Sequence, residues 1–332
     1  DPRNDEHRIV SQLTVAWMTL HNKFVSDLGY DFDDAREATI KEWQAVVLTD
    51  LLPTLLDEGV LAAVASGIRA LYVGELKDFQ TMPVEFSTAA YRLFHSRARG
   101  RYRLNDDFDG SAGKPRARLF DVGNDEPTLL GGSPLPVEML IDWDRRPIMR
   151  LPFNEAGTFD GSEILVECVD SAVDTCPIAV DVPVVCPFGT APPCELKANL
   201  ALLDLLRGQT HSLPGGIALA EYVKTLVPGL DVVSFGDMTG NVFGLPDGLS
   251  ASDIDVPLLL YLAHESIRDH DGQRLGALGS RVVAEVLFGL VETTEPSILD
   301  GDSDDDGEPF TSLVTGGSVV TMVDVLDYIG WH

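Results

Sequence analysis

Apolar residues recur at helical spacing along this chain, and this pattern limits it to a mainly helical fold. Eight stretches show the spacing, namely 8–28, 33–56, 60–71, 83–99, 196–207, 216–226, 256–268 and 277–291. Residues 100–195 contain scattered Pro and Gly, so we expect short hairpins and irregular loops there. The pattern predicts a mainly α single domain over 1–330, with a large core and long loops.

The segment 85–96 (EFSTAAYRLFHS) is the most informative of these stretches. It has no internal Gly or Pro, and Pro83 stands ahead of it as a helix start signal. Arg92 and His95 are three residues apart, so their side chains should project from one helix face. A buried histidine needs a partner, and a metal ion is one possibility. The alternative is a core histidine bonded to other protein groups.

Two further pairs of charged residues show the same spacing. Asp204 and Arg207 lie in a leucine-rich helix, where charges are costly unless each has a partner. Arg3 and Glu6 form the other pair near the first residue. Arginines, carboxylates and a histidine near apolar helices would suit haem, with arginines for its propionates and a histidine for its iron.

Several segments in matching order resemble the animal-type haem peroxidases of the peroxidase–cyclooxygenase superfamily. They are 1–6 with 20–23, 37–56, 85–96, 202–216, 272–291 and 320–330. The resemblance covers nearly the whole chain, apart from an insertion at 160–196. It implies the family fold, in which helices surround a buried haem, with long irregular loops and few short strands.

The resemblance also implies roles for single residues. His95 matches the proximal iron ligand, and Arg92 and Arg207 match the arginines that pair with the haem propionates. Arg3 matches the distal arginine, which stabilises charge as peroxide is cleaved. Glu6 matches the carboxylate that can form an ester with a haem methyl group. The implied cofactor is therefore haem b, with Glu6 as its optional covalent link.

Two features depart from the family pattern. Asp204 stands where the animal enzymes have an asparagine bonded to the proximal histidine. A carboxylate there should give the imidazole more imidazolate character and lower the reduction potential. The chain also begins inside the family domain, so we expect the distal histidine on an N-terminal fragment or second chain.

The resemblance predicts a peroxidase that reduces hydrogen peroxide and oxidises a small donor, such as a halide or a phenol. A fatty-acid dioxygenase of the same superfamily ranks second. Its radical-forming tyrosine would occupy the position of Arg92, whereas Tyr91 should point about 100° away on a helix. A non-catalytic interaction protein with the peroxidase fold is a third possibility, which rests only on the missing distal half.

The other histidines carry weaker signals. Residues 268–271 (RDHD) imitate the core of the missing distal motif, but we expect them in an exposed polar turn. His21, His211 and His264 lack ligand spacing and should have core or surface roles. His7 could approach a haem edge, and a solvated position is the alternative.

Charge and cysteines limit the partners and the compartment. The net charge of −29 should repel nucleic acid and anionic membranes, and no apolar run approaches the length of a membrane span. Four cysteines cluster in one Pro-rich segment and favour two disulfides in a secreted protein, with a zinc site as the rival. Local pairing would join Cys168 to Cys176 and Cys186 to Cys194.

An acidic loop near the end of the chain follows part of a calcium-binding pattern. The residues Asp302–Asp306 and the glycine after them have D-x-D-x-D-G spacing, but Leu313 replaces the expected bidentate glutamate. A solvated acidic turn is therefore the default, and calcium binding is the alternative.

Overall fold

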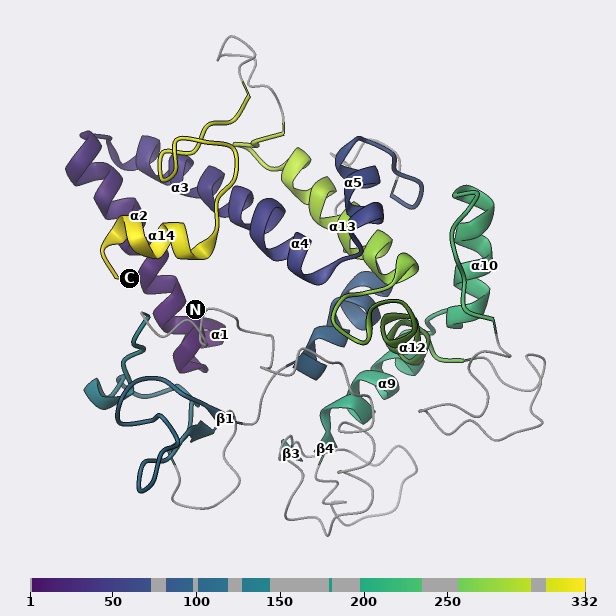
Figure 1. Ribbon diagram of the computed structural model, residues 1–332, viewed down its shortest axis with the longest axis horizontal. Helices are drawn as coiled ribbons and strands as arrows, with labels where there is room; N and C mark the ends of the chain where they lie inside the picture. Colours follow the sequence, from purple (N-terminus) through teal and green to yellow (C-terminus); the bar gives the residue numbers. More distant parts are fainter. Residues whose placement is uncertain are drawn as a thin grey trace. The chain divides into compact units, whose positions relative to one another are not determined.

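The structure is a computed structural model that describes residues 2–72, 82–97, 101–118, 127–143, 179–180, 198–234, 256–299 and 309–331. These residues are mainly helical with few short strands, which confirms the predicted mainly α class (Figure 1). The chain forms two compact units. Unit 1 contains Asp1–Gln80, Arg101–Leu151 and Ala284–His332, and unit 2 contains Thr81–Gly100 and Pro152–Val283. The peroxidase fold and the single domain stay predictions.

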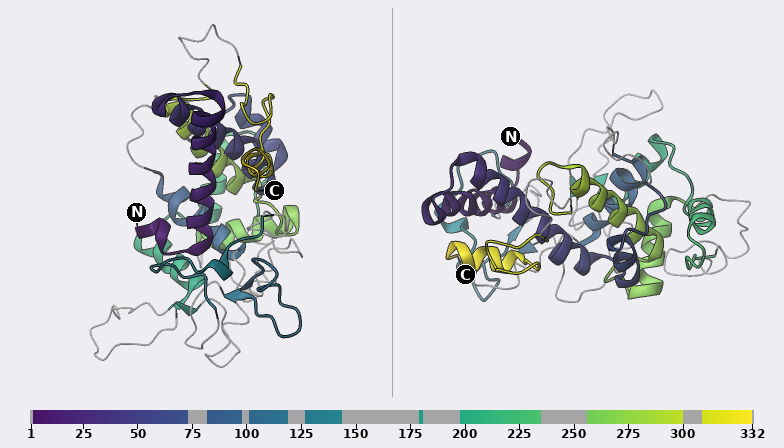
Figure 2. Two further views of the ribbon diagram at one scale, coloured as in Figure 1. Left: turned by 90° about the vertical axis from the view of Figure 1, so that its left-hand side faces the viewer. Right: turned by 90° about the horizontal axis from the view of Figure 1, so that it is seen from above.

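Unit 1 is built on a long helix, α2 (Arg8–Leu28), which has the predicted bounds. Its buried residues recur every three or four positions and form one stripe: Ile9, Gln12, Ala16, Leu20 and Phe24. This helix packs against α3 (Phe32–Val46) and α14 (Met322–Ile329), which lies beside it in Figure 2. It ends at Gly29, whose φ of 74° suits a residue without Cβ.

The helix α3 continues through a π-helical stretch, η1 (Val47–Leu51), into α4 (Leu52–Leu55). Its first turn is capped by Asp31, whose carboxylate accepts from the backbone N–H groups of Asp33 and Asp34. Pro53 lacks an N–H group and disturbs the regular helical bonds. The chain adapts with an i→i+5 bond from Leu52 N to Val47 O.

Polar side chains of α3 and η1 hold the segment that precedes α14. Buried Glu42 accepts from the Ser312 hydroxyl at 2.7 Å and from Leu313 N at 2.6 Å. Thr49 exchanges two hydrogen bonds with the backbone of Val320, at 2.8 and 2.9 Å. These bonds tie parts of the sequence that lie about 270 residues apart.

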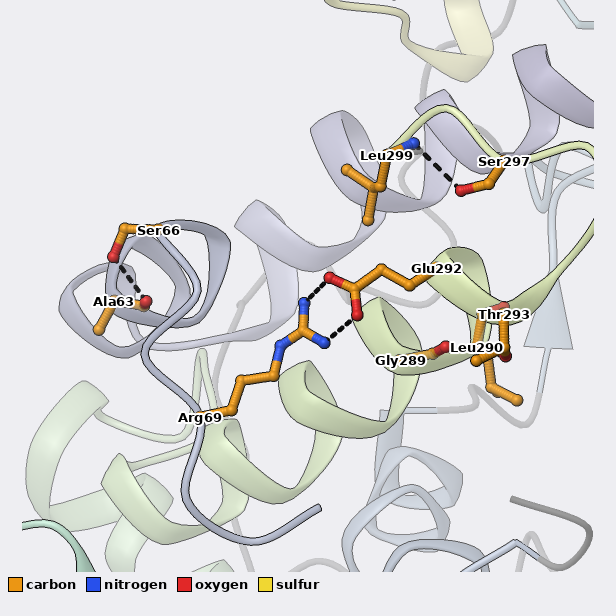
Figure 3. Close-up of polar contacts among 9 residues, drawn as sticks. All are labelled: Ala63, Ser66, Arg69, Gly289, Leu290, Glu292, Thr293, Ser297 and Leu299. Atoms are coloured by element: carbon orange, nitrogen blue, oxygen red, sulfur yellow. Dashed lines mark hydrogen bonds and ion pairs between the residues drawn. The ribbon is translucent and has the colours of Figure 1, made fainter. Parts of the chain in front are cut away.

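The helix α5 (Glu58–Ala65) ends earlier than the predicted 60–71. Gly67 adopts a φ of 87°, which stops the helix. Residues 70–72 instead donate their backbone N–H groups to the carboxylate of Glu285, in the middle of α13 (Ala277–Thr293). Arg69 also forms a bidentate ion pair with Glu292 on the same helix, in which its two terminal nitrogens donate to the two carboxylate oxygens (Figure 3). The turn after α5 is thus fixed by α13.

The loop-rich middle of the chain contains short strands, as predicted. In unit 1, β1 (Arg101–Tyr102) pairs antiparallel with β2 (Ala117–Arg118), and η5 (Val137–Met139) forms one 3₁₀ turn. In unit 2, β3 (Ala179–Val180) pairs antiparallel with β4 (Ala198–Asn199). Within the described ranges, no helix is both long and apolar enough to cross a membrane.

Unit 2 is arranged around α12 (Leu258–His270). It packs against α9 (Leu200–Thr210) and α10 (Gly216–Leu226), and against the π-helical stretch η3 (Phe86–Ala90) and the 3₁₀ helix η4 (Arg92–Arg97). Gly216 permits close packing, since a Cβ there would lie 2.0 Å from Tyr261 Cβ. The bounds of α10 are as predicted, whereas α9 begins at Leu200 rather than 196.

Candidate site around His95 and Asp204

The segment that carries His95 is helical but not a regular α-helix. The π-helical stretch η3 includes an i→i+5 bond from Tyr91 N to Phe86 O, and the 3₁₀ helix η4 follows it. The predicted α-helix over 83–99 is therefore wrong in type. Because a 3₁₀ helix has three residues per turn, Arg92 and His95 still share one face.

The structure brings His95, Arg92 and Asp204 together within unit 2. His95 Nδ1 lies 2.8 Å from Asp204 Oδ2, and an Arg92 guanidinium nitrogen lies 3.5 Å from Asp204 Oδ1. The contact follows from the packing of α9 against η3 and η4. Asp204 therefore finds its partners outside its own helix, on η4.

Burial differs sharply across this cluster. The Asp204 side chain is 4% exposed, whereas that of His95 is 42% exposed. Because a carboxylate accepts hydrogen bonds, this contact selects the imidazole tautomer with its proton on Nδ1 and its lone pair on Nε2. No described residue hydrogen-bonds Nε2. An oriented imidazole with one free nitrogen can bind a metal or take up a proton.

The two arginines of unit 2 differ in their surroundings. Arg92 is 26% exposed, and its Nε is buried without a hydrogen-bond partner. Arg207 is exposed on α9, and among the described residues its guanidinium has no ion-pair partner. Both cations could therefore receive an anionic group, but only Arg92 lies beside the His95–Asp204 pair in the described contacts.

The other two predicted site residues, Arg3 and Glu6, belong to unit 1. Arg3 lies in the short helix α1 (Pro2–Asp5), where its side chain is outside the described part, and Glu6 is exposed. The backbone here is held by Gly131 and Gly132, which donate to Glu6 O and Asp5 O at 2.8 Å each. A Cβ at Gly131 would lie 1.7 Å from Asp5 O, so only glycine fits. The roles of Arg3 and Glu6 stay predictions.

His7 was expected to be either solvated or near a haem edge, and the solvated reading is wrong. Both ring nitrogens are buried and have no hydrogen-bond partner. Burial lowers the pKa of His7, and the nearby Glu6 carboxylate raises it by less. The imidazole is therefore neutral near pH 7. In the sequence, the position of His7 next to Glu6 is the one signal that could have suggested a role for it.

Tyr91 does not face the His95–Asp204 pair in its described ring contacts. Its ring stacks on Phe86 at 5.0 Å and meets Phe94 edge-on at 5.5 Å. Burial raises the pKa of Tyr91, so the phenol stays protonated. These contacts give no support to a radical-forming role for this tyrosine.

Residues 268–270 belong to the last turn of α12, and only Asp271 lies beyond the helix. The prediction that the whole segment forms an exposed turn is therefore wrong for its first three residues. Arg268 bonds Asp269 on its own helix and Asp231, at 3.1 Å, before α12 begins. Asp271 ends the helix with a φ of 50°. Of the other histidines, His264 is buried, while His21 contacts Phe32 and His211 is exposed.

Several predictions concern residues outside the described part of the chain. These are the insertion at 160–196, apart from β3, the four cysteines Cys168, Cys176, Cys186 and Cys194, and the acidic loop Asp302–Asp306. Among the described residues, no three His, Cys, Asp or Glu side chains gather as a metal-binding group.

No known protein-family model and no curated protein matches this chain.

Proposed function

We propose that this chain binds haem b through His95 and acts as a peroxidase, which reduces hydrogen peroxide and oxidises a small donor. The observation that supports it is the hydrogen bond from His95 Nδ1 to the buried Asp204 carboxylate. Histidines that ligate metals usually donate their other ring nitrogen to such a group, which fixes the tautomer and raises the basicity of the ligand.

The residues present fit the proximal side of a haem. His95 offers a free Nε2 on a partly exposed ring, as an axial ligand requires. Arg92 has an unpartnered buried Nε, which an anionic propionate could accept from. Its positive charge also partly compensates the negative charge of Asp204.

Each residue then has a distinct task in the proposed reaction. Haem would supply the iron that binds peroxide and stores oxidising equivalents. Asp204 holds the His95 proton on Nδ1 and increases electron donation from Nε2. The roles of Arg3, in stabilising charge as the O–O bond breaks, and of Glu6, in an ester link, rest on the sequence resemblance alone.

A haem titration of the full chain tests this proposal. Wild type should develop a sharp Soret band that saturates at one haem per chain, and His95→Ala should lose it or bind at least tenfold more weakly. His211→Ala is the matched control, because it removes an exposed histidine just beyond α9 in the same unit. Unchanged haem binding and spectrum in His95→Ala would refute the proposed ligand.

A further inference from the structure

Unit 2 contains a cavity of about 360 Å³ beside Asp204. It is lined mainly by residues of α9, of α12 and of the segment 213–215. Its walls are mainly leucine and proline, including Leu205, Leu213, Pro257 and Leu258. Two polar side chains that are almost fully buried also line it, Thr88 and Asp204, each 4% exposed. The pocket is partly open to solvent, so a small molecule can enter it.

The hydroxyl of Thr88 is the feature that points to a ligand. No described residue forms a hydrogen bond with it, although the side chain is buried and borders the cavity. The hydroxyl can therefore donate a hydrogen bond to a molecule in the pocket and accept one from it. The Asp204 carboxylate accepts from His95 and Arg92 and has lone pairs left for one more donor.

We propose that this cavity binds a small neutral alcohol, with its apolar body between α9 and α12 and its hydroxyl between Thr88 and Asp204. The volume lies within the range of small-molecule pockets. The hydroxyl can donate to Asp204 and accept from Thr88, which pairs both groups at once. This site borders Asp204, which also holds the proposed haem ligand, but it does not need haem to be bound.

The charges around the cavity exclude ionic head groups. An anion would meet the Asp204 carboxylate at close range in a poorly solvated space. An ammonium group would lose its hydration next to a carboxylate that Arg92 already compensates. A neutral hydroxyl avoids both costs. Because it would share Asp204 with His95, its binding should also alter the imidazole.

Head-group selectivity in the haem-free full chain tests the proposal without any variant. Calorimetric titration should show that hexanol binds at least tenfold more tightly than hexanoate or hexylammonium, which have the same apolar body. Hexanol should also shift the ¹⁵N resonances of His95 and leave those of exposed His211 in place. The proposal is overturned by no hexanol binding up to its solubility limit, or by tighter binding of either ion.

Variants locate the binding in this cavity. Thr88→Val should weaken hexanol binding about five- to tenfold, the effect of one lost hydrogen bond, and Thr88→Ser should restore it. Leu213→Trp should fill the space and abolish binding, whereas Leu226→Trp, on an exposed position of α10 outside the cavity, should not. Equal binding by wild type and all folded variants would show that hexanol sits elsewhere.

Discussion

Among single residues, Asp204 has the largest influence on the site, because one buried carboxylate accepts from both His95 and Arg92. The partner for Asp204 could be expected from the sequence, since a charge in a leucine-rich helix needs compensation. The contact with His95 followed from the family resemblance. The pairing with Arg92 did not, because Arg92 had been assigned to a propionate, and only the packing of α9 on η4 brings its guanidinium to Asp204.

Replacing Asp204 by asparagine should raise the Fe(III)/Fe(II) potential of the haem-loaded protein. A neutral acceptor draws less proton density from Nδ1, so the imidazole donates less to iron and Fe(III) is less favoured. The expected rise is about 60 mV, which corresponds to a tenfold change for a one-electron couple. Spectroelectrochemical titration measures it, and Glu221→Gln, which removes an exposed charge on α10, is the control. An unchanged or lower potential contradicts the role of Asp204.

At the scale of secondary structure, the junction of α12 and α13 depends on a buried carboxyl group. Glu265 of α12 accepts from Leu278 N at 2.9 Å and from Gly279 N at 3.1 Å, in the first turn of α13. Burial raises the pKa of Glu265 to about 8, although these two hydrogen bonds lower it. Gly276 makes the approach possible, since a Cβ there would lie 2.2 Å from Glu265 Cγ.

This raised pKa makes stability depend on pH. Between the ordinary glutamate value of 4.5 and about 8, the folded chain binds more protons at Glu265 than the unfolded chain does. The contribution to the free energy of unfolding is therefore full below pH 4.5, and it is lost as pH rises through 8. Its slope is at most about 1.4 kcal/mol per pH unit.

Glu265→Gln should remove this slope, because glutamine does not titrate. Urea unfolding at several pH values between 5 and 8 measures the effect, as the difference between wild type and variant. Glu221→Gln, an exposed glutamate in the same unit, should leave the wild-type slope in place. If Glu265→Gln has the same pH dependence as wild type, the buried carboxyl group does not titrate in this range.

Helix boundaries could be predicted where local signals decide them. The spacing of apolar residues gave the bounds of α2 and α10, and Gly29 ends α2 where the apolar pattern ends. Apolar residues continue beyond α5 through Leu71, so the sequence favoured a longer helix. The chain turns at Gly67 because Glu285, more than 200 residues away, offers acceptors for the N–H groups of residues 70–72. Such distant pairings leave no local signal.

At the scale of the whole molecule, charge is the dominant property. The 53 acidic residues against 24 basic residues give a net charge of −29, which destabilises the folded chain through self-repulsion. Salt should therefore stabilise the protein at pH 7, because the Debye length falls from about 30 Å at 0.01 M to about 3 Å at 1 M.

The midpoint of thermal unfolding should accordingly rise with sodium chloride at pH 7. The same salt series near pH 4.3, the pI of the sequence, should show a much smaller rise because the net charge is then close to zero. Equal salt effects at both pH values would indicate that salt acts by a route other than screening.

The central claim is that His95, held by Asp204, ligates haem iron, and the iron–imidazole stretching vibration tests it most directly. Resonance Raman spectra of the reduced haem-loaded chain should contain this band in wild type. It should move to lower frequency in Asp204→Asn, because a weaker hydrogen bond at Nδ1 weakens the iron–nitrogen bond. It should vanish in His95→Ala and stay unchanged in His211→Ala. A band that persists without His95, or that does not respond to Asp204→Asn, would contradict the claim.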